Sequence, residues 1–188
     1  MNLIYLQETF WFAFICYAVP LFIYISKLHH YIEINDLLQL LNYSVLTCAF
    51  LAFSVYTFKN ALDKSIKKTD LEDTFTLYKS PARLGYGLMV LNFIIIIILA
   101  WRNGEPLYFQ RIIGLAGYLC LALKLDYGIF LIIAFYILSL WLAVKTTYID
   151  IIYAISKFGL LLYFSLYGYR YVTLQGRIGE KIRQKLEK

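Results

Sequence analysis

Charged side chains are scarce in this chain: only 16% of its 188 residues are Asp, Glu, Lys or Arg, whereas 61% are hydrophobic. A soluble domain is about half apolar and about a quarter charged. The chain therefore lacks the polar surface of a soluble fold, and its composition predicts a domain that lies in the bilayer. The length suits one compact membrane bundle with short connections and no second folded domain.

Paired cysteines and clustered metal ligands are also missing. Cys16, Cys48 and Cys120 stand singly inside apolar runs, without CxxC spacing. Single cysteines of this kind are typical of small buried hydrophobic residues. His29 and His30 are adjacent, so on a helix they face different directions and cannot act as the paired ligands of an HxxxH motif. We therefore expect no metal site and no cofactor.

Catalytic and nucleic-acid-binding motifs are absent from the sequence as well. It contains no HExxH, GxSxG, P-loop or dinucleotide fingerprint, and no two carboxylates fall together at one membrane depth. The net charge of +6 is carried by basic residues that flank the apolar runs, and no DNA- or RNA-binding motif accompanies them. The sequence predicts a protein that is not an enzyme and does not bind nucleic acid directly.

Long apolar runs are what the chain has in abundance. They cover residues 4–26, 37–58, 82–101, 106–125, 127–145 and 148–170. Because about 20 helical residues cross roughly 30 Å of hydrocarbon, we predict an all-α, polytopic bundle of about six transmembrane helices over residues 1–170. The first run lacks a basic segment before it and an A-x-A site after it, so we expect a retained helix and not a cleaved signal peptide.

The run at 106–125 is interrupted, and its uninterrupted apolar part covers only about twelve residues. Re-entrant and interfacial segments share this length, so the run either spans the bilayer or re-enters it, and five helices are the alternative to six. One helix over 106–145 would be about 60 Å long, twice the bilayer thickness. We therefore expect a turn at the sequence KLDYG, residues 124–128.

Several short motifs predict where helices begin and end. Ser80 precedes Pro81, and together they are typical of an N-cap followed by the first helical residue. Gly104 is a suitable helix terminator at the end of the third run. Thr147 and Asp150 have the spacing of a capping box, which predicts that the last helix begins near residue 148.

The distribution of basic residues selects an orientation. Placing the N-terminus in the cytoplasm puts loop 59–83 and the tail after residue 170 inside, together with most of the Lys and Arg residues. Cytoplasmic segments normally carry this excess, so we expect both termini in the cytoplasm and the chain in the bacterial inner (plasma) membrane. Trp101 and Trp141 then lie at the outer interface. The basic residues left outside are Lys27, Arg102, Arg111 and Lys145.

Lys157 interrupts the last apolar run about 13 Å from its start, near the bilayer centre. A lysine at this depth costs about 2.5–3.5 kcal/mol, so it usually faces protein or water. Tyr153 and Asp150 precede it on the same helical face, and Lys157 can extend outward past Tyr153 toward Asp150. We predict that the three form an intramembrane polar stripe. In a functional role, this stripe lines an ion path or binds a carboxylate. In a structural role, its polar groups find their partners within the bundle or at a subunit contact.

The segment 171–188 is predicted to be a basic amphipathic cytoplasmic tail. Such a helix fits either the anionic surface of the bilayer or the surface of a partner helix. Loop 59–83 is either a solvated connector or a docking surface for a cytosolic protein. The apolar stripe of the tail is Leu174, Ile178, Ile182 and Leu186, its basic stripe includes Arg177, Lys181 and Lys185, and the loop contains Lys64, Lys67 and Lys68.

Two classes of function follow from these features. The first is a membrane-embedded subunit of an oligomeric or multi-protein complex, which recruits a cytosolic partner through loop 59–83 and the tail. The second is a homo-oligomeric pore or membrane effector gated by a cytosolic partner, by analogy with small effectors of bacterial defence systems; a central lysine would favour anions. A small transporter is a third possibility, although two halves with matched helix breaks are not evident.

Overall fold

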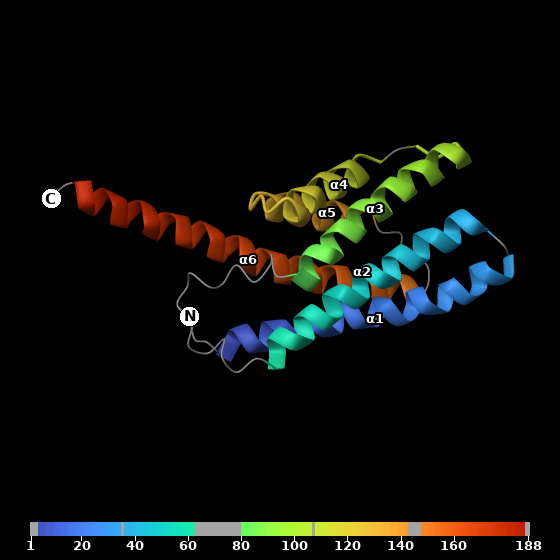
Figure 1. The fold of residues 1–188 in the computed structure, drawn as a ribbon, viewed down its shortest axis with the longest axis horizontal. Helices are drawn as coiled ribbons and strands as arrows, with labels where there is room; N and C mark the ends of the chain where they lie inside the picture. The colour runs from blue at the N-terminus through green and yellow to red at the C-terminus, as the bar shows by residue number, and fades with distance from the viewer. Residues whose placement is uncertain (1–3, 35, 63–79, 107, 143–147, 187–188) are drawn as a thin grey trace.

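The computed structural model describes residues 4–34, 36–62, 80–106, 108–142 and 148–186. Within these ranges the chain is all-α, as predicted, and no strand is present. The six helices, shown in Figure 1, are α1 (Ile4–Ile34), α2 (Leu37–Leu62), α3 (Ser80–Asn103), α4 (Phe109–Ala122), α5 (Gly128–Trp141) and α6 (Tyr148–Leu186).

Three of these helices are long and apolar enough to cross a membrane, over Phe10–Ile32, Leu37–Leu62 and Ala82–Asn103. In hydrocarbon every backbone N–H and C=O must find its partner within the protein, which a helix achieves by itself. These three candidate spans indicate a multi-pass membrane protein. Helices α4 and α5 have 14 residues each, about 21 Å, which is less than the roughly 30 Å of a bilayer core.

The helix ends follow the local chemistry of the sequence. Gly104 has a φ of +67°, and the N–H of Glu105 donates to the carbonyl of Ala100 at 2.8 Å, so α3 ends where a glycine was expected to end it. The predicted turn at 124–128 is also present, with Lys124 at a φ of 63°. Helix α6 begins at Tyr148, as predicted, while Thr147 lies outside the described residues.

Each helix packs on the next in chain order, and α6 closes the circle by packing on α1. The six helices thus form a closed ring. The α4–α5 hairpin reaches the end of the bundle where α3 begins, because Nε of Arg83 donates to the carbonyl of Ala122 at 3.1 Å. Figure 1 shows α6 extending well past this end of the bundle, which is also the end where α1 begins. We call the end of the bundle past which α6 extends the arm end, and the other end of the bundle the opposite end.

The centre of the ring is filled by an aromatic belt to which every helix contributes. Each residue of the belt is at most 4% exposed, and neighbouring residues make contact around the circle. The ring centroids are 4.9 Å apart in the stacked pair Tyr17 and Phe53, and 6.0 Å apart in the pair Tyr136 and Phe164. Tyr17 and Tyr163 complete the circle at 6.5 Å. The aromatic belt consists of Tyr17, Phe53, Tyr86, Tyr118, Tyr136, Tyr163 and Phe164.

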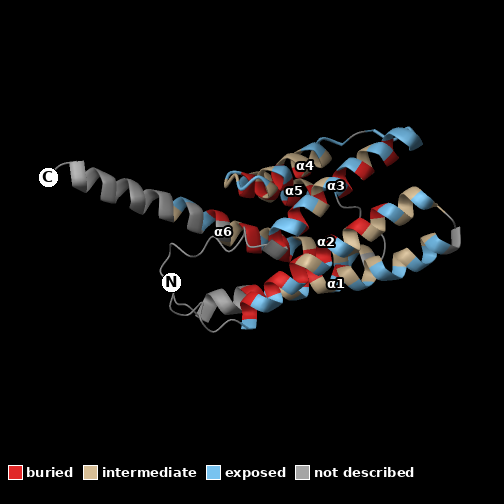
Figure 2. Cartoon of the chain, viewed as in Figure 1, coloured by how far each residue is buried: buried red, intermediate tan, exposed pale blue. Residues whose placement is uncertain are grey.

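The outer surface of the bundle is apolar too. Figure 2 shows the buried residues on the faces where helices meet, while the exposed residues point outward. Phe22 of α1 is 72% exposed and Ile155 of α6 is 65% exposed. A soluble protein would cover such residues, whereas lipid chains solvate them, so this surface agrees with the membrane assignment.

A glycine sets the closest approach between α1 and α6. A Cβ added at Gly159 would collide with Sγ of Cys16 and would lie 3.1 Å from the ring of Phe12. Small residues let helix backbones approach closely in membranes, where packing is a main source of association energy. Gly159 therefore fixes the register in which α6 closes the ring.

Candidate functional site

Antiparallel packing of α1 and α6 positions the polar side chains of both helices. The rings of Tyr17 and Tyr163 are 6.5 Å apart, and those of Tyr24 and Tyr153 are 5.7 Å apart. Residues of α1 that are farther from the arm end therefore lie beside residues of α6 that are closer to the start of α6. This register brings Lys27 of α1 next to Tyr153 of α6.

Lys27 is held by tyrosines from two other helices. Its Nζ donates to the hydroxyl of Tyr43 on α2 at 3.4 Å, and it lies 5.3 Å from the centre of that ring. The same ammonium lies 5.8 Å from the ring of Tyr153. Aromatic faces attract a cation at these distances, and more strongly where water is excluded. Tyr31 of α1 stacks on Tyr43, with the two ring centroids 5.0 Å apart.

Lys157 lies one helical turn beyond Tyr153 and is half-buried. Asp150 acts electrostatically on both Tyr153 and Lys157, so the structure brings the three residues of the predicted polar stripe together along α6. We call Tyr24, Lys27, Tyr43, Tyr153 and Lys157 the lysine–tyrosine cluster.

Sequence reasoning did not find the contribution of α1 and α2 to this cluster. Lys27 was expected only as a charge on the outer side, and Tyr43 was not considered. The signal was present, because Tyr24, Lys27 and Tyr31 recur at three- and four-residue spacing and therefore share one face of a helix. The α1 helix also continues to Ile34, past the predicted apolar run at 4–26, and so carries Lys27 on regular helix.

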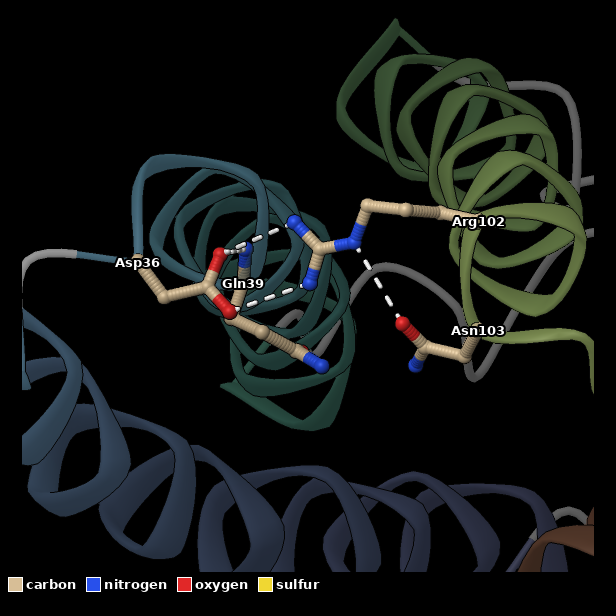
Figure 3. Close-up of polar contacts among 4 residues, drawn as sticks. All are labelled: Asp36, Gln39, Arg102 and Asn103. Atoms are coloured by element: carbon tan, nitrogen blue, oxygen red, sulfur yellow. Dashed lines mark hydrogen bonds and ion pairs between the residues drawn. The ribbon is translucent and has the colours of Figure 1, made fainter.

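An ion pair ties α2 to α3 at the opposite end, as Figure 3 shows. The two terminal nitrogens of Arg102 contact the two carboxylate oxygens of Asp36 at 3.4 and 3.1 Å. Asp36 also caps α2, since its Oδ1 accepts from the N–H of Gln39 at 3.2 Å. The Arg102 guanidinium and then the Gln39 N–H lower the pKa of Asp36 below its ordinary value. Both side chains are partly exposed, so we regard this pair as a local clamp.

Two buried polar pairs connect other neighbouring helices. Nδ2 of Asn92 on α3 donates to Oδ1 of Asn42 on α2 at 2.7 Å. The hydroxyls of Tyr118 on α4 and Tyr136 on α5 are 2.9 Å apart. Interhelical hydrogen bonds of this kind satisfy polar groups that hydrocarbon would leave unpaired. Their function is to hold the ring together.

The predicted cytoplasmic contact residues are not placed. Lys64, Lys67 and Lys68 lie outside the described residues, as do the side chains of the tail stripes, although the tail backbone is helical to Leu186. Among the residues that the structure does describe, no group of three or more His, Cys, Asp or Glu side chains is arranged to hold a metal ion.

Comparisons with known proteins give no family assignment: no family model, curated protein or solved structure matches the chain.

Proposed function

We propose that the protein is a non-enzymatic, membrane-embedded subunit of an oligomeric or multi-protein complex, which recruits a cytosolic partner at the bacterial inner membrane. In this proposal the chain crosses the bilayer six times and both termini are cytoplasmic. Its protein partners are further copies of the same chain and a cytosolic protein, and its membrane-embedded surface contacts the lipid bilayer.

The observation that carries this proposal is the continuity of α6. The helix has 39 residues and is therefore about 58 Å long, roughly twice the hydrocarbon thickness. Its first part packs in the ring, and Figure 1 shows the remainder extending past the other five helices. A continuous helix presents the tail residues in a fixed position relative to the bundle. Pre-ordering of this kind reduces the entropy that a partner must overcome on binding.

The arrangement of the ends supports a six-crossing topology. In Figure 1 the start of α1 lies at the arm end, and the far end of α6 projects well beyond the bundle on the same side. Trp101 is in the last turn of α3 and Trp141 is the last residue of α5, and both are 86% exposed. Tryptophan at helix ends is typical of the membrane interface. Helices α4 and α5 are short for a crossing, but the Arg83–Ala122 contact supports a hairpin that reaches the arm end.

The test is purification of the tagged protein in mild detergent, followed by mass spectrometry of native complexes. The variant Ile178→Asp with Ile182→Asp places two charges in the apolar stripe of the tail, and we expect it to lose the cytosolic partner. Thr173→Asp is the matched control, since Thr173 lies outside both stripes, and it should retain the partner. Retention of the partner by the double variant would refute docking through the tail.

A homo-oligomeric pore is the second candidate, and the position of Lys157 favours it. A half-buried cation on α6 would repel cations from a path beside it. The aromatic belt fills the centre of one protomer, so a path would run between protomers or require the belt to open. Conductance of Lys157→Glu in planar bilayers tests this candidate. A shift of selectivity toward cations in an intact oligomer is expected, and unchanged selectivity would exclude a path beside Lys157.

A further inference from the structure

Helix α6 continues from the bundle into its projecting part without a break. Gly168 still lies against α5, because a Cβ added there would be 3.2 Å from Cδ1 of Ile133. Just beyond it, Tyr169 and Val172 are exposed. Residues 148–168 are thus the packed part of α6. We call residues 169–186, which Figure 1 shows projecting past the bundle, the arm.

The length of the packed part matches the bilayer, so in the proposed topology the arm stands in the cytoplasm. Residues 148–168 span about 30 Å, which is the thickness of the hydrocarbon core. The headgroup layer adds roughly 5–8 Å on each side. Ile178 follows Gly168 by about 15 Å along the helix axis. The backbone from residue 178 to residue 186 therefore lies beyond the headgroups, where a lipid surface does not reach an unbroken arm.

The sequence places opposite charges on different sides of the arm. The arm has five basic residues and one acidic residue, Glu180. With about 3.6 residues per turn, the basic stripe of Arg177, Lys181 and Lys185 borders one edge of the apolar stripe. By the same spacing, Glu180 falls on the side opposite to the apolar stripe. A partner that covers the apolar stripe therefore meets a positively charged edge.

These charges distinguish the occupants that could cover the apolar stripe. A second copy of the arm would bring the same basic stripe, and its Glu180 would be on the side away from the contact, so it offers no carboxylate to the basic stripe. A lipid surface reaches only the base of the arm. An acidic amphipathic helix offers an apolar side together with carboxylates beside it, and charge complementarity of this kind guides partner choice.

We propose that the arm binds an acidic amphipathic helix of the cytosolic partner. The apolar side of that helix packs on the apolar stripe of the arm, and its Asp or Glu side chains pair with the basic stripe. This inference rests on the proposed recruiting function and adds the chemistry of the partner to it.

Peptide binding to the full-length protein in phosphatidylcholine nanodiscs tests the charge of the partner. The probe is a fluorescent synthetic helix with a leucine stripe flanked by glutamates, and its counterpart has lysines in place of the glutamates. Fluorescence anisotropy, corrected for empty nanodiscs, should show that the glutamate peptide binds at least about tenfold more tightly, with a preference that decreases as salt rises. Equal binding of the two peptides, or tighter binding of the lysine peptide, would overturn the proposal.

Charge reversals in the arm locate the contact. Lys181→Glu in the basic stripe should weaken binding of the glutamate peptide about fivefold. Arg183→Glu is the matched control outside both stripes and should change binding by less than about twofold. Reversal of Arg177, Lys181 and Lys185 together should transfer the preference to the lysine peptide, while circular dichroism verifies that the helix content is kept. A triple variant that still prefers the glutamate peptide would refute pairing through the basic stripe.

Three further outcomes separate this proposal from the alternative occupants and from the recruiting function. The glutamate peptide should bind with similar affinity in phosphatidylglycerol nanodiscs, and loss of binding there would mean that the arm lies on anionic lipid instead. Loss of the oligomer in Ile178→Asp with Ile182→Asp would assign the apolar stripe to a second copy. A cytosolic partner that the triple reversal retains would overturn the acidic partner and leave recruitment in place, whereas peptide binding without any recovered partner would support the arm chemistry and contradict recruitment alone.

Discussion

The aromatic belt and the lysine–tyrosine cluster use the same residue type in opposite ways. In the belt, tyrosine rings from neighbouring helices pack on one another, and the Tyr118 and Tyr136 hydroxyls satisfy each other at 2.9 Å. In the cluster, Tyr43 and Tyr153 instead turn their rings toward the Lys27 ammonium. The belt is closed and at most 4% exposed, whereas the cluster carries charge and is partly accessible. Tyrosine thus contributes to stability in the first region and positions a cation in the second.

The largest difference between the two regions should appear on truncation to alanine. Tyr136→Ala removes a fully packed ring and should lower the free energy of unfolding by about 3–5 kcal/mol, because its surroundings cannot close the cavity. Tyr153→Ala removes a half-buried ring and should have a clearly smaller effect. Thermal unfolding in detergent measures both. Equal losses would show that the cluster is as much a part of the core as the belt.

A double-mutant cycle should then isolate the hydroxyl pair of the belt. Tyr118→Phe leaves the Tyr136 hydroxyl buried without its partner and should cost about 1–3 kcal/mol, as should the reverse single variant. The double variant removes both hydroxyls and should be closer to the native protein than the sum of the singles. Strictly additive losses in the unfolding free energies would contradict a direct bond between the two hydroxyls.

A smaller effect is expected from removing the charge of the cluster. Lys157→Met keeps the length of the stem and removes a half-buried cation, and replacements of this kind are often neutral or stabilising. Asp150 is seven residues earlier, near the start of α6, so its carboxylate stays close to the interface. Thermal stability of the variant should match or exceed that of the native protein. A marked loss would mean that the lysine supports the fold.

Acidification should produce the smallest change, at the clamp beside the cluster. The folded-state pKa of Asp36 is lower than its ordinary value of 3.8, so its contribution is complete above that value and is lost as the pH falls through the folded-state pKa. The difference in Tm between the native protein and Asp36→Asn should therefore shrink below about pH 4. Arg102→Gln is the companion variant and should follow the same trend. A difference that is constant from neutral to acidic pH would contradict an ionic contribution.

The fold could be predicted from the sequence wherever local chemistry determines it. The apolar runs gave the positions of the six helices, and Gly104 and Lys124 stand at the helix ends that were expected. The first apolar run was predicted to end at residue 26, where Ser26 and Lys27 interrupt the apolar pattern. The helix itself continues to Ile34, so the prediction was too short. A polar interruption near the interface reduces hydropathy without breaking a helix.

The cluster could be predicted only in part. The stripe on α6 follows from spacing within one helix, which the sequence contains. The contacts of Lys27 with Tyr43 and Tyr153 depend on the register between three helices, and that register is set by side-chain packing such as Gly159 on Cys16. Packing partners far apart in the chain have no local signature. The length of α6 beyond the bundle was likewise not evident, because a tail helix and a continuous arm share the same periodicity.

Closure of the ring by α6 has a consequence for how the protein is made. Synthesis proceeds from the N-terminus, so α2 to α5 can each pack on the helix made just before it. Helix α1 keeps one face without its final neighbour until α6 is synthesised. The belt lacks Tyr163 and Phe164 until then, and Lys27 lacks Tyr153. Of these six helices, α6 is made last and completes both regions, so a chain that stops before α6 would expose their unfinished faces to the membrane.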